Sequence, residues 1–191
     1  MRLANGRREK PKGVSMVNQD LEKRIKEKIR SIPDYPKKGI IFRDTNPLFH
    51  DGELFGKCID AFAEHFEGSV DAVAGVEARG FIIGSALAHR LGKGFIPIRK
   101  EGKLPGDKVK KTYSLEYSKD TIEIQRDAVA KNERILLADD LIATGGTASA
   151  ASELIESLGG KVIGLAVIVE LLDLHGREKL EGKKVFSLVK Y

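Results

Sequence analysis

The chain has 191 residues, of which 41% are hydrophobic and 32% are charged, and its formal net charge is +5. This length predicts one domain with a core of ordinary size, because domains usually contain roughly 100–200 residues. The longest apolar runs are far shorter than the ~20 residues that cross a bilayer, and the single cysteine, Cys58, cannot form an internal disulfide. These features exclude a membrane-spanning chain and a disulfide scaffold, and they favour a cytoplasmic protein without a membrane partner.

The positive charge is concentrated in the first fifteen residues, where five basic side chains stand against Glu9 alone. That segment therefore carries four of the five net charges, and the rest of the chain is nearly neutral. A basic tail on a nearly neutral domain is not a basic binding face, so we expect no nucleic-acid partner. We expect residues 1–16 to be a disordered basic extension and residues 17–191 to form one domain, with Met16 a candidate natural start.

The predicted elements begin with an amphipathic helix near the N-terminus. Leu21, Ile25 and Ile29 recur every four residues there, after the candidate N-cap Asn18. We expect this helix to end before Pro33, in a turn-rich loop. Apolar spacing predicts the further helices and buried strands in this order: strand 40–42, helix 54–66, strand 70–76, helix 81–91, strand 94–98, strand 135–138, helix 148–158, strand 162–170, helical piece 174–180 and strand 185–189.

The order of these elements predicts the architecture. Strand, loop, helix and strand over residues 70–98 form a βαβ unit, which requires a parallel sheet and a right-handed crossover. Residues 99–111 are predicted to be a long polar loop with six lysines and arginines, and residues 113–117 and 121–125 to be a hairpin of half-exposed strands. The predicted fold class is α/β: a mostly parallel central sheet flanked by helices, with a small N-terminal hood and a flexible β-hairpin loop.

Residues 135–147 contain the strongest chemical signal. A short apolar run predicts a buried strand, and Asp139 and Asp140 follow where that strand leaves the core. Residues 143–147, Ala-Thr-Gly-Gly-Thr, then form a loop that opens a helix. Backbone N–H groups of such a loop bind phosphate, and carboxylates accept hydrogen bonds from sugar hydroxyls. We therefore predict a site for a phosphorylated sugar.

Neighbouring loops support this interpretation, since ligands bind at the carboxyl ends of strands in an open parallel sheet. Loops 77–80, 99–111 and 139–147 all follow such ends. Residues 75–80 have the glycine spacing of a Walker loop but lack the following Lys-Ser/Thr, so an NTPase is rejected. No Gly-x-Gly-x-x-Gly follows a strand, which argues against a dinucleotide enzyme. The four histidines are scattered without metal-ligand spacing, so no protein metal site is predicted.

The chain resembles the type I phosphoribosyltransferases, because residues 135–147 match their signature for 5-phosphoribosyl-1-diphosphate (PRPP). Several segments are similar to the members that act on adenine: residues 29–44, 75–81, 98–106, 113–117, 169–170 and 176–180. The resemblance implies a purine-salvage transferase that converts adenine and PRPP to AMP and pyrophosphate. It also implies a homodimer and an Mg²⁺ ion held mainly by PRPP and water.

The resemblance further implies roles for single residues. Ile41, Phe42 and Arg43 would form the adenine pocket, while Glu116 would handle the proton at the purine ring beside Tyr117 on a closing loop. The residues implied for the ribose and 5′-phosphate of PRPP are Asp139, Asp140, Ala143, Thr144, Gly145, Gly146 and Thr147. Those implied for pyrophosphate, partly across a dimer interface, are Arg79, Arg99, Lys100 and Lys103.

Two alternatives remain open at this point. A related transferase would accept hypoxanthine or guanine, which present a 6-oxo group where adenine presents an amino group. A PRPP-sensing, nucleic-acid-binding regulator would need an added DNA-binding domain, which a short basic tail does not supply. Asn46, Ser118 and Ala138 depart from the family pattern, and they put the choice of purine in question more than the PRPP site.

Overall fold

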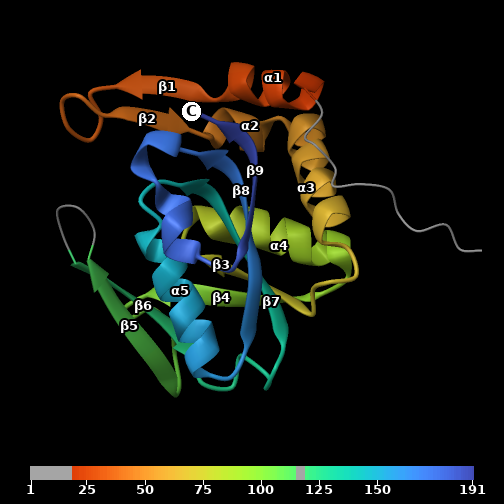
Figure 1. Cartoon of the computed structure of the whole chain (residues 1–191), viewed down its shortest axis with the longest axis vertical. Helices are drawn as coiled ribbons and strands as arrows, with labels where there is room; N and C mark the ends of the chain where they lie inside the picture. The colour runs from red at the N-terminus through yellow and green to blue at the C-terminus, as the bar shows by residue number, and fades with distance from the viewer. Residues whose placement is uncertain (1–18, 115–118) are drawn as a thin grey trace, which may run out of the picture.

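A seven-stranded sheet forms the centre of the molecule in the computed structural model, which describes residues 19–114 and 119–191 (Figure 1). The strands in chain order are β3 (Ala72–Val76), β4 (Gly94–Lys100), β5 (Lys108–Ser114), β6 (Lys119–Gln125), β7 (Arg134–Ile142), β8 (Lys161–Glu170) and β9 (Lys184–Lys190). Across the sheet they lie in the order β5-β6-β4-β3-β7-β8-β9. From β4 to β9 all neighbours are parallel, and the hairpin β5–β6 extends the β4 edge in the antiparallel sense. The predicted α/β class and mostly parallel sheet are confirmed.

Apolar cores lie on both faces of the sheet, and β7 contributes to each. Successive strand residues point to opposite faces, so Leu136 packs in the core with α3 (Gly52–Phe66) and α4 (Arg79–Leu91). Leu137 packs instead in the core with α5 (Gly146–Ser157). Because both faces are covered, every residue of β3 is buried, and residues 135–138 of β7 are all apolar and buried. The two central strands therefore give the acids at the end of β7 a rigid support.

The N-terminal hood consists of α1 (Gln19–Lys28), β1 (Arg30–Pro33), β2 (Ile41–Asp44) and α2 (Asn46–His50). Figure 1 shows it above the C-terminal segments, at the end of the sheet where β8 and β9 finish. Strand β1 pairs with β2 in antiparallel register, with Ile32 opposite Phe42. The predicted first helix and its end before Pro33 are confirmed: α1 ends at Lys28, and the residues of β1 that follow pair with β2. Neither β1 nor α2 was predicted.

Two further expectations are corrected. The long polar loop at 99–111 is much shorter, because β4 continues to Lys100 and β5 begins at Lys108. Charged strand residues are accommodated there by ion pairs, such as Lys108 to Glu123 (3.0 Å) and Lys110 to Glu101 (2.7 Å). The helical piece at 174–180 is two short 3₁₀ helices, η1 (Leu172–Leu174) and η2 (Gly176–Leu180). Within the described part of the chain, no helix is long and apolar enough to span a membrane.

Candidate active site

A cavity of about 310 Å³ lies where β3 and β7 end and α4 and α5 begin. Most of its wall comes from residues 76–79 and 139–148, and Lys100, Tyr113 and Asp120 complete one side. The parallel strands bring these loops to one edge of the sheet, as expected for a fold of this type. Of the three loops predicted to converge, 77–80 and 139–147 therefore lie side by side, and the segment 99–111 contributes Lys100.

Asp139 and Asp140 both line this cavity, although they belong to β7 rather than following it. The strand was predicted to end at residue 138, but it continues to Ile142 through pairing with β8. Consecutive strand residues point to opposite faces, so the two carboxyl groups have different surroundings. Asp139 is half-buried and its Oδ1 accepts a hydrogen bond from the Asp140 N–H (2.8 Å), whereas Asp140 is only 3% exposed.

The Asp140 carboxylate has two partners from distant parts of the chain. Thr45 donates its hydroxyl to Oδ2 at 2.9 Å, and the Arg79 guanidinium lies 3.2 Å from the same oxygen. Burial raises the pKa of Asp140, and the charge of Arg79 and the hydrogen bond from Thr45 oppose that rise. The pKa of Asp139 is also raised, first by burial and then by the adjacent Asp140 charge. The pair therefore holds a proton more tightly than two free carboxylates.

The phosphate loop, residues 143–147, turns into α5 at a point that only glycine fits. Gly145 has φ +74°, and a Cβ there would lie 2.2 Å from the carbonyl oxygen of Gly176. Gly176 is equally restricted, since its Cβ would lie 2.1 Å from the Ala143 carbonyl oxygen. The helix α5 starts at Gly146, so its free N–H groups and its positive dipole end open on the cavity. This end of the cavity suits an anion.

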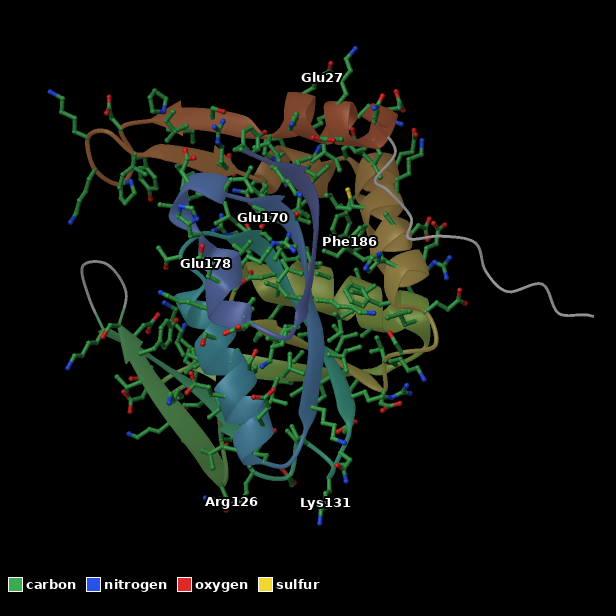
Figure 2. All side chains as sticks on the ribbon, in the orientation of Figure 1. Glu27, Arg126, Lys131, Glu170, Glu178 and Phe186 are labelled. Atoms are coloured by element: carbon green, nitrogen blue, oxygen red, sulfur yellow. The ribbon has the colours of Figure 1, made fainter. Side chains whose placement is uncertain are left out.

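An ion pair holds in place the segment around Gly176, which packs against the loop of residues 143–147. Arg177, next to Gly176, contacts Glu170 through Nε to Oε1 (2.8 Å) and Nη2 to Oε2 (2.6 Å). Glu170 ends β8 and is labelled in Figure 2, and Ser187 of β9 donates a third hydrogen bond to it. These donors hold the pKa of Glu170 below its usual range despite burial. Sequence analysis assigned no role to Gly176, whose neighbours alone reveal why it is glycine.

The residues predicted for adenine lie in β2, beside the cavity rather than in its wall. Ile41 is 52% exposed, while Phe42 and Arg43 are half-buried. The Arg79 guanidinium, which lines the cavity, lies 5.4 Å from the centre of the Phe42 ring. The Arg43 guanidinium stacks over the Tyr191 ring at 3.8 Å. The hood therefore adjoins the cavity through Phe42 and Arg79.

The four cations predicted for pyrophosphate separate into two groups. Arg79 and Lys100 line the cavity, and Lys100 Nζ contacts Asp120 Oδ2 at 2.8 Å. Arg99 (3.2 Å) and Lys103 (3.0 Å) instead pair with Glu77, and neither is among the described residues of the cavity wall. Their hydrogen bonds lower the pKa of Glu77 to about 2.

Tyr113 and Asp120 are cavity residues to which sequence analysis gave no function. They face each other across the hairpin, and the Tyr113 hydroxyl lies 3.1 Å from the Thr147 hydroxyl and 3.5 Å from Asp120 Oδ2. The alternating pattern of their segments predicted two strands, but it did not predict which face of the hairpin lines the cavity. Glu116 and Tyr117, predicted to be catalytic, lie between these two strands and outside the described residues.

Comparisons with known proteins agree with this geometry. Residues 46–190 match the model of the phosphoribosyl transferase domain. The adenine phosphoribosyltransferase of Halothermothrix orenii is 53% identical over 166 residues, covering 86% of this chain and 98% of the relative. The crystal structure of the enzyme from Thermoanaerobacter pseudethanolicus superposes with a TM-score of 0.85 at 48% identity, covering 88% of this chain and 99% of that one.

A third similar protein was solved with ligands. The adenine phosphoribosyltransferase of Saccharomyces cerevisiae, complexed with an imino-altritol bisphosphate and adenine, has a TM-score of 0.84 and 42% identity. That alignment covers 88% of this chain and 98% of the yeast chain. The fold, the cavity at the end of β7 and these likenesses together show that the chain belongs to the adenine phosphoribosyltransferases of the type I phosphoribosyltransferase family.

Proposed function

We propose that this purine-salvage enzyme, which forms AMP from adenine and PRPP, binds PRPP in the cavity at the end of β7. One observation supports this most: two adjacent acids, one buried and one half-buried, and a glycine loop at a helix N-terminus form one wall. Residues 143–147 hold the 5′-phosphate through backbone N–H groups and the Thr144 and Thr147 hydroxyls. Asp139 and Asp140 accept hydrogen bonds from the ribose hydroxyls. The anionic end and the sugar of the substrate are thus bound by different chemistry.

The adenine ring lies against β2 in this proposal. Phe42 offers a ring face, and the backbone groups of Ile41 and Arg43 recognise the edge of the base. The contact between Phe42 and Arg79 supports it, because it places the hairpin next to the PRPP cavity. The base nitrogen and the sugar carbon can then meet between the two elements, which is the geometry that a transfer reaction requires.

Charge separation during the transfer explains the cations. Breaking the bond from C1 of ribose to pyrophosphate builds positive charge on the sugar and negative charge on the leaving group. Arg79 and Lys100, which line the cavity, stabilise the leaving group electrostatically. Glu116 acts as the general acid or base for the purine proton, and Tyr117 helps to exclude water from the activated sugar.

The residues fit an Mg²⁺ ion that enters with the substrate. Across residues 19–114 and 119–191, no group of three or more His, Cys, Asp or Glu side chains could hold a metal. Mg²⁺ keeps several waters and binds substrate phosphates readily. When bound, the ion neutralises part of the pyrophosphate charge. The protein's own contribution at this end is the pair Arg79 and Lys100.

Arg99 and Lys103 act across a dimer interface in this proposal, on the pyrophosphate of the partner's site. Neither cation is among the described residues of its own cavity wall, although both pair with Glu77, which is, and this position at the margin of the cavity supports such a role. The test mixes two inactive chains, one with Asp140→Asn and one with Lys103→Met. If Lys103 works in trans, each hybrid dimer contains one complete site, and mixing restores roughly a quarter of the wild-type turnover by random pairing. No restored activity would place Lys103 in its own chain's site.

A purine panel with PRPP and Mg²⁺ tests the choice of base. We expect rapid AMP formation from adenine and slow turnover of hypoxanthine and guanine. Chromatography of the nucleotide products measures each rate. Faster turnover of hypoxanthine would contradict the adenine pocket at β2. Salt-dependent binding to duplex DNA without turnover would favour the regulator instead.

A further inference from the structure

Thr45 lies at the junction between the hood and the sheet and is fully buried. It precedes α2, and its carbonyl oxygen accepts the N–H groups of Leu48 (3.0 Å) and Phe49 (3.2 Å). A threonine at this N-cap position usually uses its side chain to accept a helix N–H. Here the side chain makes no such bond, and Asp44 Oδ1 instead accepts the N–H of Asn46 at 3.0 Å.

The hydroxyl of Thr45 is directed to the catalytic cavity. It donates to Asp140 Oδ2 at 2.9 Å, across 95 positions of the sequence. That oxygen also faces Arg79 of α4, at 3.2 Å, and the neighbouring carboxylate on β7 is Asp139. Arg79 in turn contacts the ring of Phe42, three residues before Thr45. The chain of contacts therefore starts and ends in the hood and passes through a ribose-facing acid.

We propose that Thr45 is a positioning residue, which fixes the Asp140 carboxylate for the ribose of PRPP and holds the base-binding strand β2 in register with it. The inference rests on the proposed role of Asp140 in ribose binding. Hydrogen bonds to a buried carboxylate are stronger than neutral ones, and a carboxyl group that loses a donor favours its protonated form. Thr45 acts through Asp140 and does not touch the reacting atoms.

The test compares Thr45→Val, which has nearly the same shape without the hydroxyl, with Thr45→Ser, which retains it. We expect Thr45→Val to weaken PRPP binding in calorimetry roughly 10-fold and Thr45→Ser by less than about 2-fold. The acid limb of the kcat/KM profile for PRPP should move to higher pH in Thr45→Val and return in Thr45→Ser. The direction of the pH shift separates positioning from loss of packing. Loss of the Thr45 hydrogen bond raises the pKa of Asp140, whereas loss of packing that admits water would lower it and move the acid limb the other way.

Controls keep the inference separate from its premise. Ser69→Ala removes a hydroxyl that donates to the Phe66 carbonyl before β3 begins, at the end of that strand away from the cavity. It should leave PRPP affinity unchanged. Unchanged affinity in Asp140→Asn would overturn the ribose assignment itself. Weakened PRPP binding in Asp140→Asn with wild-type affinity in Thr45→Val would overturn only the role of Thr45. Equal losses of PRPP affinity in Thr45→Val and Thr45→Ser would also overturn it. If Thr45→Val fails to fold, Thr45→Ala against Thr45→Ser isolates the hydroxyl in the same way.

Discussion

The phosphate loop and the hood hairpin form neighbouring parts of one site by different means. Residues 143–147 are consecutive, are shaped by two glycines and are supported by the central strands of the sheet. The hairpin β1–β2 is a separate two-stranded sheet, and Ile41 and Tyr35 on it are more than half exposed. The comparison suggests that the enzyme holds the common sugar phosphate rigidly, and recognises the base with an element that has few neighbours.

The largest expected effect tests the rigidity of the phosphate loop. Gly145→Ala should weaken PRPP binding more than about 100-fold, because the Cβ would clash with the Gly176 carbonyl and the residue has positive φ. Calorimetry with PRPP measures the loss. Gly68→Ala is the matched control, since Gly68 also has positive φ (+73°) but nothing lies within 4 Å of its Cβ. Similar losses of affinity in both variants would show that backbone strain, not the clash, dominates.

A smaller effect tests the hairpin. Phe42→Ala should raise the KM for adenine roughly 10-fold and leave the Kd for PRPP within about 2-fold, because only the ring face is removed. Steady-state kinetics and calorimetry report the two quantities separately. Tyr35→Ala serves as control, since it removes the ring that packs against Phe42 in a T-shaped contact, at a centroid distance of 5.2 Å, and leaves the Phe42 ring itself. A large loss of PRPP affinity in Phe42→Ala would mean that the two regions are not independent.

The smallest effect concerns Glu77, an acid in the cavity wall. Its pKa is lowered from 4.5 to about 2 by Arg99 and Lys103, so it stabilises the folded state only while it is ionised. That contribution is complete above about pH 4.5 and is lost as the pH falls toward 2. The two cations are partly exposed, so we expect Glu77→Gln to lower the free energy of unfolding by about 1 kcal/mol at pH 7.

Urea unfolding of wild type and Glu77→Gln at pH 7 and at the lowest pH that keeps both folded measures this difference. It should shrink as the pH falls. A constant difference would show that the amide changes packing rather than charge. Lys23→Met is a suitable control, because its ion pair with Glu27 is long, at 4.0 Å, and exposed.

The same contrast explains what the sequence could predict. Residues 143–147 could be predicted as a phosphate loop because the signal lies in consecutive residues, and the expectation that this loop and the acids of β7 lie together agrees with the cavity they line. Strand β7 is longer than predicted. Strand β1 was missed because it is four residues of mixed polarity, and its hydrogen bonds depend on a partner about ten residues away. Thr45 and Asp140 are separated by 95 positions in the sequence, and no local pattern indicates that they are in contact.

The cations show a further reason. The lysines and arginines in residues 99–111 predict attraction to an anionic group, which the family resemblance identifies as pyrophosphate, but they do not predict which acids of the chain pair with these cations. Glu77 forms ion pairs with Arg99 and Lys103, whereas Asp120 forms one with Lys100 at the cavity. Only the three-dimensional arrangement separates these pairs. A strand register one residue different would exchange the faces on which they lie.

The central place of β7 in the sheet has a consequence for local unfolding. Amide protons in a strand paired on both sides and covered on both faces exchange only when most of the domain opens. Residues 135–138 of β7 are paired in this way with β3 and β8, whereas among the described residues the hairpin β1–β2 forms a separate two-stranded sheet. We therefore expect the hairpin to open locally more readily than the part of β7 that leads to Asp139 and Asp140. Binding of product should then slow hydrogen exchange far more in the hairpin than in β7.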